Sequence, residues 1–251
     1  MEIQSGLSQV IPPEIKNDAF YNAIQQIASK EDVRSILEIG SSSGQGSTEA
    51  FVQGILRNPS RPNLFCIEIS RERFQVLRNH YKDIPLVKCY NVSSVSVDEF
   101  PSVQKVENFY KTVDSQLKAY PLEQVIDWLN QDIQYLKNSN VPENGIEIIR
   151  EENGIDIFDV VLIDGSEFTG NIELEHVYGA RYILLDDIGT FKNYESHQRL
   201  LQDNNYELII CDFLLRNGYS IFSRKDKTFQ SAWHRSRHEF AERSLVENLV
   251  N

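Results

Sequence analysis

Three acidic side chains stand at the ends of two apolar runs and could together hold a cation. Asp164 ends the run FDVVLID, and Asp186 and Asp187 end the run RYILLDD. If the two runs are neighbouring parallel strands, their ends lie about 5 Å apart, and carboxylates so close repel one another unless they are protonated or bridged by a cation. Oxygen ligands of this kind suit Mg²⁺ or Ca²⁺ better than zinc. Alternatively, Asp164 contacts only a cofactor or the backbone, and Asp187 caps the next turn.

Other side chains near these carboxylates could move a proton. Glu167 comes three residues after Asp164, where a glutamate could accept a proton or add a metal ligand. We expect His176 and Lys192 to reach the same rim, the lysine to contact an anionic substrate. We therefore take Glu167, His176 and Lys192 as catalytic candidates. The alternatives are a surface glutamate and a structural histidine.

A glycine-rich segment follows an apolar run nearer the N-terminus. Residues 35–48 are SILEIGSSSGQGST, with Gly40, Gly44 and Gly46 after the run. Glycine lets a ligand lie against the main chain and can adopt positive φ, and a following helix start favours polar or anionic groups. The spacing GxxxGxG differs from the dinucleotide pattern GxGxxG, and the segment lacks the lysine of a phosphate loop. Both differences argue against NAD binding and nucleoside triphosphate hydrolysis.

Glu68 is a second candidate for ligand binding. It lies 22 residues after Gly46, near the end of the apolar run NLFCIEI. A carboxylate at the end of a second strand can accept hydrogen bonds from both ribose hydroxyls of a nucleoside. The alternative is a solvated charge at a strand end.

The apolar runs alternate with helical patterns, which predicts the elements that position these groups. We expect strands over 35–39, 63–69, 86–92, 158–164, 181–187, 206–213 and 218–225, and helices over 14–30, 46–57, 70–81, 173–180 and 195–203. Apolar strands that alternate with helices predict an α/β fold with a doubly wound, mostly parallel sheet. The pair Asn217-Gly218 predicts a final hairpin, which adds an antiparallel edge. Ligands bind such sheets at the carboxyl ends of the strands.

One long segment interrupts the alternation. Residues 98–153 show helical patterns, at 106–120 and 121–138, and no clear strand. From 101 to 153 the chain carries nine Asp or Glu against five Lys or Arg. We expect a helical insertion or lid between the third and fourth strands, a C-terminal helix over 228–251, and a single domain over 1–251.

Three motifs in this order resemble class I S-adenosylmethionine-dependent methyltransferases: LEIGSSSGQGST, FCIEIS and VVLIDGSEF. The resemblance covers about residues 33–93 and 157–225. It implies a seven-stranded, Rossmann-like sheet with an antiparallel strand seven, and S-adenosylmethionine as cofactor. Glu38, Gly40, Ser41 and Gly44 would surround the amino-acid part of the cofactor, Glu68 would hold the ribose and Ile69 would pack on the adenine. The full set of candidate cofactor-binding residues is Glu38, Gly40, Ser41, Ser42, Gly44, Gly46, Thr48, Glu68, Ile69, Ser93 and Asp164.

The carboxylate spacing is similar to that of metal-dependent O-methyltransferases of the catechol and macrolide-sugar types. The resemblance implies that Asp164, Asp186 and Asp187 hold Mg²⁺. Such a metal binds two substrate oxygens, lowers the pKa of a hydroxyl and aligns it with the methyl group. The catechol type has a lysine, and many sugar-modifying relatives a histidine, where this chain has Glu167. The role of general base therefore does not carry over directly.

Composition limits the remaining classes of protein. The chain has 251 residues, 41% of them hydrophobic, and a formal net charge of −12, which argues against a general nucleic-acid or membrane binder. The three cysteines predict buried free thiols in a reducing compartment. We see no signal peptide and no run long enough to span a membrane, so we expect a soluble, cytoplasmic protein.

These patterns together predict methyl transfer from S-adenosylmethionine to a hydroxyl of a small molecule, a sugar or secondary metabolite, assisted by Mg²⁺. One alternative is an NAD-dependent oxidoreductase on a similar sheet. Another is a catalytically silent fold that binds a nucleoside or a partner protein. The amphipathic ends of the chain make a homodimer plausible.

Overall fold

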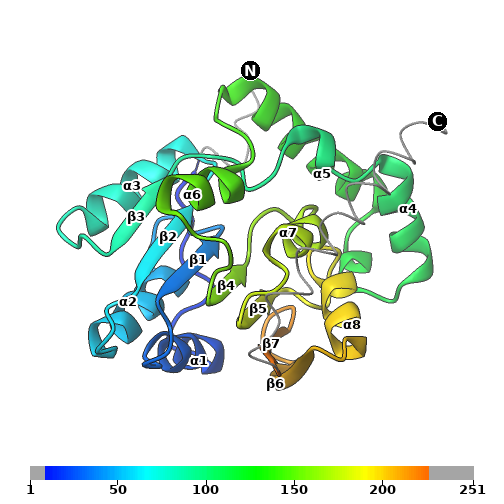
Figure 1. Cartoon of the computed structure of the whole chain (residues 1–251). Helices are drawn as coiled ribbons and strands as arrows, with labels where there is room; N and C mark the ends of the chain where they lie inside the picture. The colour runs from blue at the N-terminus through cyan, green and yellow to red at the C-terminus, as the bar shows by residue number, and fades with distance from the viewer. Residues whose placement is uncertain (1–8, 226–251) are drawn as a thin grey trace.

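A computed structural model of the chain, which describes residues 9–225, shows a seven-stranded sheet with helices on both faces (Figure 1). The strand order is β3-β2-β1-β4-β5-β7-β6, and the first five of these strands run parallel. All seven predicted strands are present and somewhat shorter than expected. They are β1 (Ser35–Ile39), β2 (Asn63–Ile67), β3 (Val87–Tyr90), β4 (Val160–Ile163), β5 (Tyr182–Asp186), β6 (Tyr206–Asp212) and β7 (Tyr219–Arg224).

The final hairpin forms one edge of the sheet, as predicted. Strand β7 pairs antiparallel with both β5 and β6, so the antiparallel strand lies inside the sheet and β6 forms its edge. Asp186 at the end of β5 pairs with Tyr219 at the start of β7, so β7 runs back beside β5. The predictions of an antiparallel strand seven and of an antiparallel hairpin at the edge of the sheet are both confirmed.

Two layers of helices cover the sheet. Alternate residues of one strand face opposite sides, so Ile36 packs in the core with α1, α2 and α3, whereas Leu37 packs in the core with α6, α7 and α8. The helices of the first layer are α1 (Ala19–Ala28), α2 (Ser47–Arg57) and α3 (Arg71–Tyr81); the others are α6 (Gly145–Asn153), α7 (Gly170–Val177) and α8 (Tyr194–Gln202). Helix α1 begins later than predicted, because the Asp18 carboxylate accepts a hydrogen bond from the Tyr21 N–H at 2.8 Å and caps the helix.

The segment between β3 and β4 contains only helices and loops. Its first predicted helix is divided into α4 (Val103–Thr112) and the short 3₁₀ helix η3 (Gln116–Ala119). The other helices of this segment are η2 (Val97–Glu99), α5 (Leu122–Ser139) and α6. Helices α4 and α5 lie beyond the carboxyl ends of the strands (Figure 1). They share a third core, in which Phe109 packs edge-on against Phe191 at a centroid distance of 5.0 Å. Because Phe191 lies in the loop after β5, this core joins the segment to the site end of the sheet.

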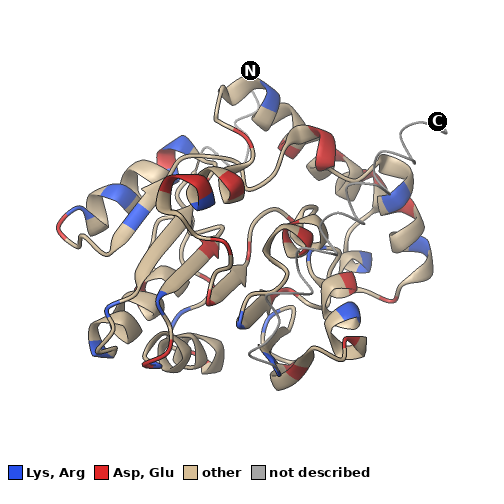
Figure 2. Cartoon of the chain, in the orientation of Figure 1, with Lys and Arg blue, Asp and Glu red and all other residues tan. Residues whose placement is uncertain are grey.

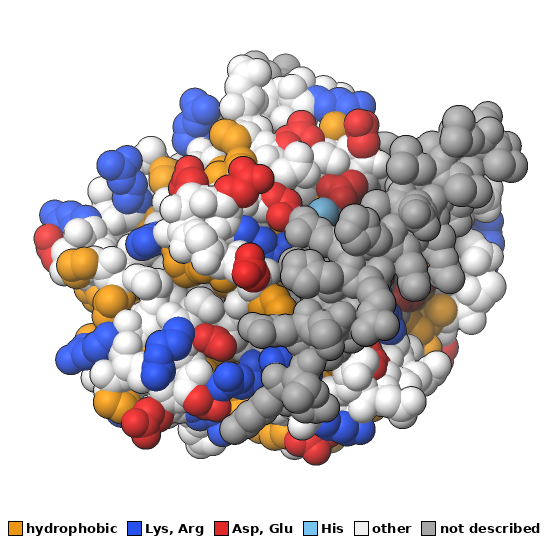
Figure 3. Space-filling view, in the orientation of Figure 1, with side chains coloured by type: hydrophobic (Ala, Val, Ile, Leu, Met, Phe, Trp, Pro, Cys, Tyr) orange, Lys and Arg blue, Asp and Glu red, His pale blue; other side chains and the backbone are white. Residues whose placement is uncertain are grey.

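Charged residues are dispersed over the described part of the chain. Lys and Arg stand among Asp and Glu on many elements (Figure 2), and the visible described surface mixes both signs with small apolar patches (Figure 3). Within residues 9–225, none of the helices is both long and apolar enough to cross a lipid bilayer. The helix predicted over 228–251 falls beyond the described residues.

Candidate functional site

A cavity of about 240 Å³ opens at the carboxyl ends of β1, β2 and β4. Its position matches the ligand site expected for a doubly wound sheet. The glycine-rich loop and the end of β2 form one side, and the loop after β4 forms the other. Residues 11–15 and two residues of the helical segment, Phe100 and Asp132, complete the wall.

The glycine-rich loop presents its main chain to this cavity. The N–H groups of Gly40 and Ser41 both donate to the Ile67 carbonyl at 3.0 Å, which ties the loop to β2. Positive φ angles at Gly40 (88°) and Ser42 (48°) turn the chain back on itself. A Cβ at Gly40 would lie 2.0 Å from the Asp164 carbonyl oxygen. Glycine is therefore required at position 40 by both backbone conformation and space.

Three predicted cofactor contacts lie behind the loop instead. Glu38 is fully buried and accepts hydrogen bonds from Ser41 Oγ at 2.8 Å and Thr48 Oγ1 at 2.7 Å. Burial raises the pKa of the Glu38 carboxyl. A Cβ at Gly44 would meet Tyr81 Cε2 at 2.7 Å, so this glycine allows α3 to approach. Glu38, Gly44 and Thr48 are absent from the cavity wall. Their contacts with the loop and with α3 shape the loop instead.

The structure brings Glu68 to the cavity wall, as predicted. Its side chain is 4% exposed and accepts the Ser42 N–H on Oε2 and the Ser70 N–H on Oε1, both at 2.7 Å. Burial raises the pKa of this carboxyl. A carboxylate has about four lone-pair sites, so two backbone bonds leave room for ligand hydroxyls. Ile69 and Ser93 also line the cavity, and Asn91 donates its amide to the Glu68 carbonyl at 2.8 Å.

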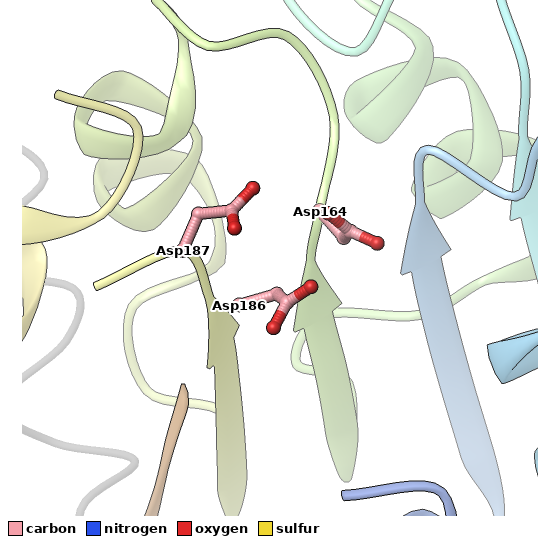
Figure 4. Close-up of side chains that lie close together, drawn as sticks. All are labelled: Asp164, Asp186 and Asp187. Atoms are coloured by element: carbon pink, nitrogen blue, oxygen red, sulfur yellow. The ribbon is translucent and has the colours of Figure 1, made fainter. Parts of the chain in front are cut away.

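The three predicted carboxylates converge at the ends of β4 and β5 (Figure 4). Oxygen atoms of Asp164, Asp186 and Asp187 all lie within 4.8 Å of one another. Asp186 and Asp187 are only 2% and 7% exposed, whereas Asp164 reaches the cavity wall. Burial raises the pKa of Asp164, and it raises the pKa of Asp186 to about 6.

Basic side chains already neutralise this group of carboxylates. Lys192 Nζ lies 2.9 Å from Asp164 Oδ1 and 2.7 Å from Asp187 Oδ2. Arg216 Nη2 lies 2.8 Å from Asp186 Oδ1. Burial opposes the charge of Lys192, but Asp164 and Asp187 raise the pKa of its ammonium group well above the ordinary value. Lys192 is thus an ammonium ion and not a general base.

The fit of a divalent ion to this rim is incomplete. The oxygen donors have the right chemistry for Mg²⁺, which binds its ligands at about 2.0–2.1 Å. An ion bridging Asp164 and Asp187 would occupy the space that the Lys192 ammonium now fills. The Asn217 amide also donates to Asp187 Oδ1 at 2.9 Å. With Lys192 in this position the arrangement does not fit a second cation, and the Mg²⁺ site stays a prediction.

The two remaining catalytic candidates occupy different places. Glu167 accepts hydrogen bonds from Thr190 Oγ1 at 3.1 Å and the Lys192 N–H at 3.3 Å, and burial raises its pKa to about 7. It therefore lies beside the rim, behind the cavity wall. His176 was predicted at the same rim, but the structure does not bring it there: its Nε2 lies 2.6 Å from Glu99. His176 forms an ion pair that joins α7 to η2.

Two residues of the site escaped the sequence analysis. Arg216 lies in the hairpin turn 29 positions beyond Asp187, and no spacing pattern links the two. Asp132 comes from α5 and accepts the Ser166 Oγ hydrogen bond at 2.6 Å. An isolated Asp in an amphipathic helix resembles any solvated acidic residue. A contact over this sequence separation becomes visible only after folding.

Comparison with known proteins bears on the fold. No protein-family model matches the chain, and no curated protein matches it in sequence. A methyltransferase from Geobacter sulfurreducens is 12% identical, with 85% of this chain and 81% of that chain covered and a TM-score of 0.51. An O-methyltransferase from Bacillus cereus, solved in complex with SAH, is 12% identical, with 85% and 84% covered and a TM-score of 0.50. The chain has the fold of class I S-adenosylmethionine-dependent O-methyltransferases.

Proposed function

We propose that this chain transfers the methyl group of S-adenosylmethionine to a hydroxyl oxygen of a small molecule, such as a sugar or secondary metabolite. One observation carries the proposal. A single cavity joins a main-chain loop and a buried carboxylate, Glu68, at one end to Asp164 and Lys192 at the other. The first end suits a nucleoside, and the second suits a polar acceptor.

The end near β1 and β2 would hold the cofactor. S-adenosylmethionine would supply a methyl group on a positively charged sulfonium sulfur. Glu68 would accept hydrogen bonds from the ribose hydroxyls with the lone pairs that Ser42 and Ser70 leave unused. Ile69 offers an apolar surface to the adenine ring, and the bare main chain of Gly40 allows close approach.

The end near β4 would hold the acceptor and remove its proton. Asp164 lies on the cavity wall and its pKa is raised by burial, so its carboxylate can take a proton from a hydroxyl group. Lys192 can donate a hydrogen bond to the acceptor oxygen. Alignment of the attacking oxygen with the methyl group supplies much of the rate enhancement in such displacements.

The helical segment between β3 and β4 would define the acceptor pocket. Asp132 of α5 is hydrogen-bonded to Ser166 in the loop after β4, and both residues line the cavity. Phe168 and Phe191 anchor the loops after β4 and β5 in the core of α4 and α5. A movement of these helices would therefore move the loops that carry the acceptor-binding groups.

Isothermal titration calorimetry with S-adenosylhomocysteine and with NAD⁺ tests the proposal. We expect one S-adenosylhomocysteine molecule to bind per chain, and NAD⁺ not to bind. Binding of NAD⁺ alone would favour the oxidoreductase, and binding of neither would remove the basis of the proposal. Release of S-adenosylhomocysteine in the presence of hydroxylated acceptors then measures the activity itself.

A further inference from the structure

The acidic rim contains its own cation. We propose that the ammonium group of Lys192 permanently occupies the position between Asp164 and Asp187 that a divalent metal would take. The rim then binds the acceptor oxygen through Lys192, without an exchangeable ion. The part concerning the acceptor rests on the proposed function, whereas the part concerning the cation rests on the geometry of the rim.

The backbone around Lys192 is fixed, so its side chain has a defined direction. The next residue, Asn193, is fully buried, and its amide donates to the carbonyls of Ile163 at 3.0 Å and Asp186 at 2.7 Å. These two carbonyls belong to β4 and β5. The preceding residue, Phe191, is packed in the core of α4 and α5. Lys192 is therefore held between the two strand ends that carry the carboxylates.

The Lys192 side chain is enclosed as well as paired. It is 9% exposed, and its ammonium lies 2.9 Å from Asp164 and 2.7 Å from Asp187. A divalent ion at the same oxygens would remove both hydrogen bonds and leave a buried ammonium beside a second positive charge. Like charges at such distances disfavour one another strongly in a buried site.

The third carboxylate has a separate fixed partner. Arg216 pairs with Asp186 at 2.8 Å and also with Asp18, which caps α1. Arg216 thus links the rim to the segment just before α1, whose residues 11–15 line the cavity. A metal ion would compete with this second ion pair too. Each carboxylate of the rim therefore has a built-in basic partner.

This arrangement changes what the acceptor must offer. Two of the three N–H bonds of the Lys192 ammonium point to carboxylates, and one is left for a ligand in the cavity that Lys192 lines. One donor holds one oxygen, whereas a metal ion can bind two adjacent oxygens. An acceptor for this chain therefore needs one hydroxyl at the rim. It does not need a second oxygen next to that hydroxyl.

Titration with Mn²⁺, followed by electron paramagnetic resonance, tests the cation assignment. The samples are the full chain, Lys192→Met, and Lys111→Met as matched control, since Lys111 pairs with Glu107 on the exposed side of α4. We expect the unmodified chain and Lys111→Met to leave Mn²⁺ free. Lys192→Met should bind one Mn²⁺ at least about tenfold more tightly than the unmodified chain, because Asp164 and Asp187 then lack a cation. Its melting temperature should rise with Mn²⁺.

Two further results decide the matter if Lys192→Met does not fold alone. The double variant Lys192→Met with Asp187→Asn removes one charge of each sign, and we expect it to fold and leave Mn²⁺ free. Tight binding of one Mn²⁺ by the unmodified chain, abolished by Asp187→Asn, would overturn the proposal. Because no S-adenosylmethionine is present in this titration, its outcome is independent of the test of the proposed function.

Discussion

The two ends of the cavity hold polar groups in different ways. Near β1 and β2, backbone N–H groups hold one carboxylate, that of Glu68, in place by hydrogen bonds. The turn at Gly40 leaves no space for a side chain. Near β4 and β5, charged side chains form ion pairs: Lys192 with Asp164 and Asp187, and Arg216 of the hairpin turn with Asp186. The first end depends on backbone conformation, and the second on charge balance.

This difference predicts how each end responds to substitution. At the backbone end, an added methyl group should do more harm than a lost charge, because close packing leaves no room. At the charged end, shape should matter less than the sign and protonation of each group. The following experiments test the comparison, in order of decreasing expected effect.

The largest effect is expected for Gly40→Ala. The new Cβ would lie 2.0 Å from the Asp164 carbonyl oxygen, at a φ of 88°. Overpacking and positive φ together should lower the free energy of unfolding by at least about 3 kcal/mol. Gly154→Ala is the matched control: its φ is 62°, but nothing lies within 4 Å of the new Cβ. We expect a loss of about 1 kcal/mol there. Equal losses in denaturant unfolding would show that space at Gly40 is unimportant.

The next effect concerns binding at the same end. Glu68→Gln removes the charge that would accept ribose hydroxyls, and hydrogen bonds to charged groups contribute about 1.5–3 kcal/mol. Affinity for S-adenosylhomocysteine should therefore fall by about 10–100-fold in calorimetry. The control is Glu72→Gln, an exposed residue of α3 that is absent from the cavity wall. Unchanged affinity in Glu68→Gln would mean that the ribose lies elsewhere.

The backbone end could be predicted from sequence because local patterns encode it. An apolar run, three glycines and a carboxylate at the next strand end specify the turn and Glu68 without long-range information. The seven strands follow from the same patterns. For Glu38 and Thr48 the sequence predicted a contact with the cofactor but not their place behind the loop, because sequence does not say which side of a loop a side chain faces.

The charged end was only half predictable. Adjacent parallel strands place Asp164 beside Asp186 and Asp187 by geometry alone. Lys192 was expected at this rim and lies there, but its pairing with Asp164 and Asp187 was not predicted. Arg216 was missed, because it comes from a loop whose direction depends on tertiary packing. His176 was misplaced for the same reason, since a helical position near the rim in sequence turned out to face Glu99. Charge balance is a property of the folded site and leaves no periodic signal.

A third prediction uses pH at the charged end. Burial raises the pKa of Glu167 from 4.5 to about 7, so the folded state holds its proton more tightly than the unfolded state. Its contribution to stability is present below pH 4.5 and is lost as pH rises to about 7. Glu167→Gln should therefore be more stable than the unmodified chain above pH 7, by about 1–3 kcal/mol. In denaturant unfolding, the difference in free energy of unfolding between the two proteins should shrink toward pH 4.5. A difference independent of pH would mean that the pKa of Glu167 is not raised in the folded state.

The smallest effect is expected at His176, which tests whether the ion pairs outside the cavity are purely structural. Burial alone would lower the pKa of its imidazole, but Glu147 and Glu99 raise it from 6.5 to about 9. The stabilising charge is thus fully present below pH 6.5 and is lost as pH rises through about 9.

His176→Gln should accordingly lower the free energy of unfolding by about 1–2 kcal/mol at pH 6, and by much less at pH 10, because these groups are partly solvated. His80→Gln, on the exposed side of α3, is the control and should change little at either pH. Affinity for S-adenosylhomocysteine should be unaffected in both variants, since neither residue lines the cavity. Weaker binding in His176→Gln alone would contradict a purely structural role. It would mean that the Glu99–His176 ion pair influences the cavity although His176 does not line it.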